Sequence, residues 1–168
     1  FLGRPDDTPA GDAFERRLYV CRRTIEKKAD AEFALRDKIF YVCSMSSRTI
    51  VYKGMLVATQ MRRFFIDLND AAVKTAVALV HSRYSTNTTP SWERAHPNRF
   101  IIHNGEINTL KGNVNWIRAR EPNLYSPVLQ HDLERVMPII NREGSDSAIL
   151  DNVLEFLVMN GRPLTRAA

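Results

Sequence analysis

The sequence predicts an α+β fold in which antiparallel sheets are covered by helices on their outer faces. The first observation is a set of short runs rich in β-branched and aromatic residues, a composition typical of strands. These runs lie at 39–44, 48–53, 75–83 and 100–103. The second observation is their order, because several runs follow one another without a helical crossover, as antiparallel neighbours do.

Helices are expected at both ends of the chain and between the strands. Over 11–29 apolar residues recur at steps of four, three and four and form one helical face. This face consists of Phe14, Leu18, Cys21 and Ile25. A short helix is expected over 59–65 with Thr59 as its N-cap, and another over 109–120. Ser145 is expected to cap a last helix over 146–159, which Asn160-Gly161 ends.

Turns separate these elements. Met45-Ser46-Ser47 suits a hairpin between the first two strands. Asn104-Gly105 is a strong turn pair at the end of the strand 100–103. The segment 30–37 is ambiguous and fits either a loop or a further helical turn.

Composition excludes several classes of protein. The chain has 168 residues, 44% of them hydrophobic, which suits one domain with a core. No apolar run is long enough to span a bilayer, and the net charge of +5 is scattered, so neither a membrane nor a nucleic acid is an expected partner. The two cysteines favour a reducing, cytoplasmic location, and both Cys21 and Cys43 are expected in the core. The four histidines have no metal-type spacing, so no metal is expected.

Three groups of residues are candidates for chemistry. Arg83, at the end of a predicted buried strand, either forms a structural ion pair or grips a carboxylate through two parallel bonds. His103-Asn104-Gly105 is either a plain hairpin turn or an oxyanion hole, in which the Asn104 amide and the Gly105 N–H are the donors. Asp146 is either an acid in the first turn of a helix or the acceptor for a ligand ammonium group. Arg83 and Asp146 together would complement an α-amino acid.

Longer motifs carry a family resemblance. The runs HSRYSTNTTPSW, HNGEINTLKGNVNW and GSDSAILDNVLE occur in this order after YVCSMSSRTIVYKGM. Over residues 14–157 the sequence resembles the glutamine amidotransferase domain of the large subunit of glutamate synthase. The run HNGEINTLKGN distinguishes this type from other class II glutamine amidotransferases, which share only the shorter His-x-Arg, Asn-Gly and Ser-Asp elements.

The resemblance implies a fold and an activity. The fold would be the αββα four-layer sandwich of the N-terminal-nucleophile hydrolases. The activity would be glutaminase, the hydrolysis of L-glutamine to glutamate and ammonia. In the parent enzyme the ammonia would reach 2-oxoglutarate in a synthase domain of the same polypeptide, with FMN, an iron–sulfur cluster and a small reductase subunit or ferredoxin. These residues would hold none of those cofactors.

The resemblance also implies roles for individual residues. Arg83 would bind the α-carboxylate of glutamine and Asp146 its α-amino group, while Asn104 and Gly105 would form the oxyanion hole. Two further residues, Thr86 and Asn87, would line the substrate pocket. Smaller departures from the family pattern are Tyr84 in place of Phe and His96 in place of Gln, and they affect only local packing.

One departure concerns the nucleophile. In the family this is a Cys at the mature N-terminus, whereas residue 1 here is Phe. We therefore expect residues 1–168 to be an internal part of one amidotransferase domain that lacks the nucleophile segment and the C-terminal end, and to be inactive alone. The alternative is a catalytically dead amino-acid-binding or regulatory module on the same fold.

Overall fold

The computed structural model describes residues 2–32, 40–83 and 89–168. Helices of two kinds make up its regular structure. The α-helices are α1 (Asp12–Glu32), α2 (Ala58–Phe64), α3 (Leu110–Arg120), α4 (Leu133–Val136), α5 (Asp146–Met159) and α6 (Leu164–Ala167). The 3-10 helices are η1 (Ile66–Asn69), η2 (Trp92–Arg94), η3 (Glu121–Asn123) and η4 (Gln130–Asp132).

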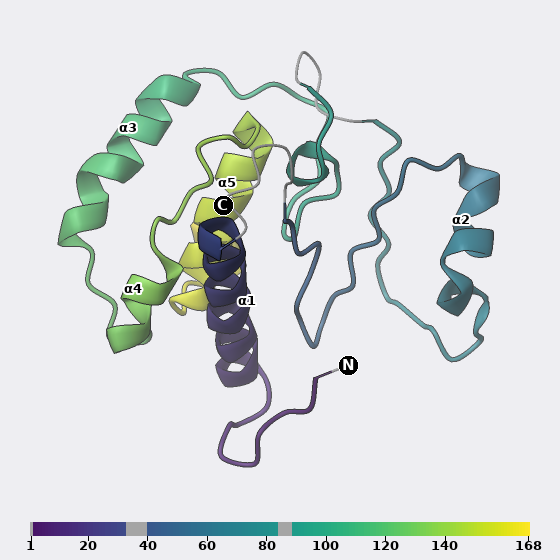
Figure 1. Ribbon diagram of the computed structural model, residues 1–168, viewed down its shortest axis with the longest axis horizontal. Coiled ribbons are helices and arrows are strands. Elements are labelled where there is room, and N and C mark those ends of the chain that lie inside the picture. Colours follow the sequence, from purple (N-terminus) through teal and green to yellow (C-terminus); the bar gives the residue numbers. More distant parts are fainter. Residues whose placement is uncertain (1, 33–39, 84–88) are drawn as a thin grey trace.

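The core lies where α1, α4 and α5 meet. α1 contacts both α4 and α5, and Figure 1 shows these helices grouped while α2 lies far to the other side. The buried cluster contains Tyr19, Val20, Leu129, Val136, Ile139, Ile140, Ile149, Phe156 and Met159. Burial of this apolar surface is the main force that holds the N-terminal helix against the C-terminal one.

The buried face of α1 differs from the predicted one. Cys21 is exposed and Ile25 is 42% exposed, whereas Arg22 and Glu26 are buried. The helix is therefore turned so that a charged pair faces the core, where Arg22 bonds to Glu26 and to Glu155 of α5. The apolar spacing placed the helix correctly but not its orientation, because a paired buried charge outweighed the apolar stripe. Both cysteines were predicted to lie in the core. This is wrong for Cys21, which is exposed, and Cys43 is half-buried.

Caps decide where α5 begins and ends. Ser145 Oγ accepts the Ala148 N–H at 3.2 Å, as predicted from the sequence. Gly161 has a φ of +84°, and the Arg162 N–H reaches back to Leu157 O at 3.1 Å. This left-handed ending is the Schellman arrangement. At α2, in contrast, Thr59 lies inside the helix and the N-cap is Val57, so that predicted cap was wrong.

The predicted sheets, and with them the αββα sandwich, are contradicted. No residue of 2–32, 40–83 or 89–168 belongs to a β-strand, and the described residues of the predicted strands lie outside regular elements. Several side chains of two of these runs point into solvent, since Ile50 is 69% exposed and Val77 is 71% exposed, whereas residues 100–103 are half-buried. β-propensity describes how well a side chain fits a half-buried pleated surface, and it forms no strand without a neighbour to complete the ladder.

Side-chain oxygens take up backbone N–H groups in this region instead. The predicted hairpin 45–47 is held by Glu15, whose carboxylate accepts the Ser47 N–H at 2.7 Å and the Ser46 hydroxyl at 2.7 Å. Ser44 Oγ accepts the Val51 N–H at 3.0 Å. Lys53 ties the same segment to η2 by donating to Trp92 O and Ala95 O. The segment is thus fixed by single polar contacts rather than by a sheet.

Candidate functional site

The His103-Asn104-Gly105 segment forms a bend at the surface. Asn104 and Gly105 are exposed, and the Gly105 N–H donates to His103 Nδ1 at 3.1 Å. His103 Nδ1 therefore acts as an acceptor in this conformation. In this conformation the N–H that was predicted to stabilise an oxyanion is engaged within the bend.

Asp146 lies directly beside this bend. Its Oδ2 accepts the Ile107 N–H at 2.8 Å, and its Oδ1 accepts the Ser147 N–H at 2.6 Å. Partial burial raises the pKa of Asp146, but the hydrogen bonds from Ile107 and Ser147 and the nearby His103 lower it to a net value below the ordinary one. Asp146 is therefore ionised at neutral pH and half-buried at the start of α5.

Three histidines connect the segment that contains Arg83 to the Asn104-Gly105 bend. The ring centroids of His81 and His96 are 4.8 Å apart, and those of His96 and His103 are 5.4 Å apart. We call His81, His96 and His103 the histidine cluster. Because the Arg83 N–H lies 3.0 Å from His81 Nδ1, the cluster connects the Arg83 segment to the Asn104-Gly105 bend. Sequence reasoning missed the cluster, since it searched the histidines only for metal-type spacing.

His96 is the central ring of the histidine cluster and is 9% exposed. Burial lowers its pKa, as do His81, His103 and Lys53, and only Asp146 acts in the opposite direction; the result is a pKa of about 4. His96 is therefore neutral at physiological pH. A neutral ring between two others can pack closely without charge repulsion.

The other predicted site residues are placed less closely. Arg83 is exposed. Thr86 and Asn87 lie outside the described residues. Asp146 thus bonds to Ile107, two residues after the Asn104-Gly105 bend, and among the contacts of the described residues Arg83 is linked to the bend through the histidine cluster.

Asp151, one and a half turns along α5 from Asp146, is a second residue that sequence reasoning missed. It is 1% exposed, and its carboxylate accepts three consecutive N–H groups, those of Arg99 at 3.1 Å, Phe100 at 2.7 Å and Ile101 at 3.0 Å. Burial and the nearby Glu155 raise the pKa of Asp151, against the lowering effect of these N–H groups. The sequence signal that could have found it is an Asp between the apolar residues of a predicted helix, because such a carboxylate needs hydrogen-bond donors if it is buried.

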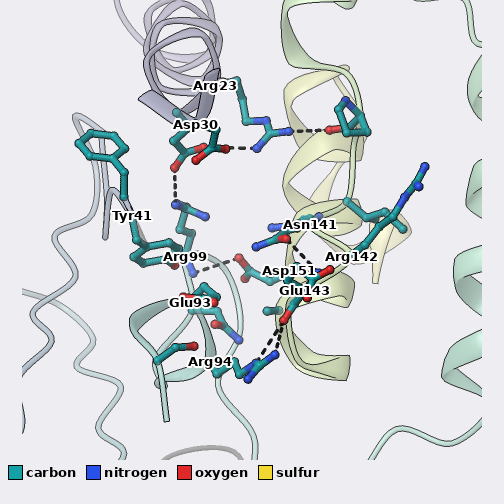
Figure 2. A pocket seen from close by; sticks show the side chains of 18 of the residues that line it. Arg23, Asp30, Tyr41, Glu93, Arg94, Arg99, Asn141, Arg142, Glu143 and Asp151 are labelled. Atoms are coloured by element: carbon teal, nitrogen blue, oxygen red, sulfur yellow. Dashed lines mark hydrogen bonds and ion pairs between the residues drawn. The ribbon is translucent and has the colours of Figure 1, made fainter. Parts of the chain in front are cut away.

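A cavity of about 910 Å³ opens between α1, α5 and the segment 89–99. Figure 2 shows its charged wall, with Arg23, Arg99 and Asp151 engaged in the contacts drawn. Arg99 pairs with Glu26 at 3.0 Å, and Arg23 pairs with the same carboxylate at 3.3 Å. None of Arg83, Asn104, Gly105 and Asp146 lines this cavity, so it is distinct from the candidate site.

The described ranges hold no group of three or more His, Cys, Asp or Glu residues arranged to bind a metal ion. The chain's two cysteines are also too few for an iron–sulfur cluster, which takes about four thiolates. Among the helices of the described part, none is both long and apolar enough to cross a membrane.

Comparison with known proteins defines the class to which these motifs belong. The sequence model of the family Glutamine amidotransferases class-II matches residues 1–168. This chain therefore belongs to the class II glutamine amidotransferases, as the sequence motifs predicted.

Curated relatives narrow the class to one kind of enzyme. The chain is 53% identical over 162 residues to the glutamate synthase (NADPH) large chain of Bacillus subtilis, covering 96% of this chain and 10% of that protein. It is 51% identical over 148 residues to the glutamate synthase (NADH) of Saccharomyces cerevisiae, covering 88% and 7%. It is 45% identical over 151 residues to the chloroplastic ferredoxin-dependent glutamate synthase of Spinacia oleracea, covering 90% and 9%. The chain thus spans a tenth or less of the length of these relatives, all of which are glutamate synthases.

Proposed function

We propose that this chain supplies the glutamine-binding and oxyanion-stabilising part of the glutaminase site of a glutamate synthase. One observation carries the proposal beyond family membership. The bond between Asp146 and the Ile107 N–H joins two motifs that lie 39 residues apart in the sequence. An ionised carboxylate beside an Asn-Gly bend is the arrangement that an α-ammonium group and a developing oxyanion require.

Each residue has a defined role in the proposed reaction. Arg83 binds the α-carboxylate of L-glutamine, and Asp146 accepts its α-ammonium group. When a thiolate attacks the side-chain amide, the Asn104 amide and the Gly105 N–H donate to the oxyanion. Since an oxyanion is a stronger acceptor than an imidazole nitrogen, it displaces His103 Nδ1 from the Gly105 N–H. Thr86 and Asn87 line the pocket in this proposal.

The thiol and the later steps belong, in this proposal, to a longer polypeptide. Cys21 is exposed on α1 and Cys43 lies in the segment before the 45–47 turn, so we assign the nucleophile to neither. The ammonia would pass to 2-oxoglutarate in a synthase domain of that polypeptide. FMN and an iron–sulfur cluster, fed by a reductase subunit or ferredoxin, would be held there, since the residues here do not fit the cluster. A reducing, cytoplasmic location suits two free cysteines.

Two substitutions in the full-length protein test the proposal. Asn104→Ala removes one oxyanion donor and should lower the kcat for glutamine hydrolysis about 100- to 1,000-fold with little change in KM. Arg83→Lys replaces a fork by a point charge and should raise KM about tenfold while kcat changes less. Initial rates of ammonia release measure both. Unchanged kcat in the first variant would remove the oxyanion role.

A second candidate function is an amino-acid-binding module without catalysis. Neither Cys21 nor Cys43 is assigned as the nucleophile, and the same pocket residues would serve binding alone. Mass-spectrometric sequencing of the mature N-terminus of the full-length protein separates the two. An unblocked Cys there supports the glutaminase, whereas any other first residue supports the binding module.

A further inference from the structure

Asp151 holds the segment 99–101, which leads into the Asn104-Gly105 bend. Three successive N–H groups, from Arg99 to Ile101, converge on its two carboxylate oxygens. A carboxylate that receives three peptide N–H groups is a strong anchor, because each bond is charge-assisted. Asp151 is 1% exposed, so loss of its carboxylate would leave these buried N–H groups without their acceptor.

The same helix also holds the other end of the segment. Asp146, at the start of α5, accepts the Ile107 N–H. The Asn104-Gly105 bend therefore lies between two carboxylate anchors that are five residues apart on α5. Both anchors belong to a helix that is capped by Ser145 and packed into the core.

Further contacts fix the first anchor. The Arg99 side chain pairs with Glu26 of α1 at 3.0 Å, so the backbone and the side chain of this residue are both held. Phe100 packs against the core cluster. The segment entering the bend is thus connected to α1 and α5 by polar and apolar contacts together.

We propose that Asp151 is a positioning residue that sets the place of the oxyanion donors Asn104 and Gly105 by clamping the N–H groups of residues 99–101. This inference rests on the proposed glutaminase function. Asp151 touches no substrate in this proposal and acts only through the backbone. Donor groups must lie within a fraction of an ångström of the developing charge, so an entering segment that shifts should slow the chemical step more than it weakens binding.

Asp151→Asn in the full-length protein is the test. The amide keeps the shape of the carboxylate but replaces one acceptor oxygen by an NH₂ group that faces an N–H donor. We expect kcat for glutamine hydrolysis to fall about 10- to 100-fold, while KM changes less than about threefold. Equal kcat in the variant and the wild type would overturn the proposal.

Glu15→Gln is the matched control. Glu15 is also a buried carboxylate that accepts backbone and hydroxyl donors, but it anchors residues 46–47 instead of the bend. Its variant should lower the melting temperature and leave kcat near the wild-type value. A loss of kcat in Glu15→Gln as large as in Asp151→Asn would mean that general destabilisation, not positioning, explains the effect.

Hydrogen exchange of the wild-type protein keeps the proposal testable if Asp151→Asn does not fold. The amides of residues 99–101 should exchange at least about 100-fold more slowly than in an unstructured peptide. Exchange at the unstructured rate would overturn the anchor. A full-length protein without any glutaminase activity would instead overturn the proposed function, and the exchange result would still decide whether the anchor exists.

Discussion

His96 illustrates what the sequence says about a single residue and what it leaves out. It occupies a position where Gln is usual in the family, and the sequence analysis expected this difference to affect only local packing. In the structure its ring is the centre of the histidine cluster, between His81 and His103. No spacing rule predicts this cluster, because its three members come from separate segments that only folding brings together.

The buried ring of His96 should make stability depend on pH. Its pKa is about 4 in the folded chain, against an ordinary value near 6.5. Between these values the unfolded chain binds the proton and the folded chain does not, so stability falls as the pH is lowered from 6.5 towards 4. Above pH 6.5 this group contributes no slope. Melting temperatures across this range should show the fall, and His96→Gln should flatten it.

His131 provides the control for this measurement. Its side chain is 80% exposed and its contact with Asp132 is 3.7 Å long and screened by solvent, so His131→Gln should change the pH dependence much less than His96→Gln does. A His96→Gln variant with the wild-type slope would show that other groups cause the dependence.

At the scale of elements, the contact between α1 and α5 was only half predictable. The sequence placed both helices within a few residues of their observed bounds. The predicted apolar face of α1 did not include Arg22 and Glu26, yet both are buried, with Arg22 2.5 Å from Glu155. Periodicity counts apolar residues and cannot foresee that a complementary charge on a helix distant in sequence will draw a charged face inward.

Removing one member of this buried pair should be costly. Arg22→Leu leaves Glu155 buried without its cation, and we expect unfolding free energy to fall by about 3 to 5 kcal/mol. Urea denaturation at low protein concentration measures it. Arg17→Leu, at an exposed position of the same helix, should change stability by less than about 0.5 kcal/mol. A similar small change for Arg22→Leu would show that the pair contributes little.

For the whole molecule, the main feature is an uncovered apolar surface. The segment 40–83, which includes α2, carries many large exposed apolar side chains, and it extends away from the core in Figure 1. They include Phe40, Ile50, Met55, Val57, Phe64, Ile66, Val73, Val77, Leu79 and Val80. Exposed apolar surface of this extent favours association.

We therefore expect the 168-residue chain to self-associate. Sedimentation velocity should show species larger than a monomer that increase with protein concentration. Replacing Val77 and Val80 by Lys should reduce this association, because charges at these positions interrupt the exposed apolar surface. A charge-matched control is Thr165→Lys with Ala168→Lys, both at exposed positions outside the segment 40–83. A monodisperse monomer at all concentrations would contradict the prediction.

The sequence by itself determined the family, the helices at both ends of the chain and the Ser145 cap, because these depend on local patterns and on motifs such as HNGEINTLKGN. The tertiary structure alone decided which face of α1 is buried, that the predicted strands have no sheet among the described residues, and that Asp146 and Asp151 hold the Asn104-Gly105 bend from one helix. Each of these depends on a partner that is distant in sequence. The spacing of residues in the sequence reflects local conformational preference. A strand pairing, an ion pair or a carboxylate anchor forms only when folding brings a second residue into contact.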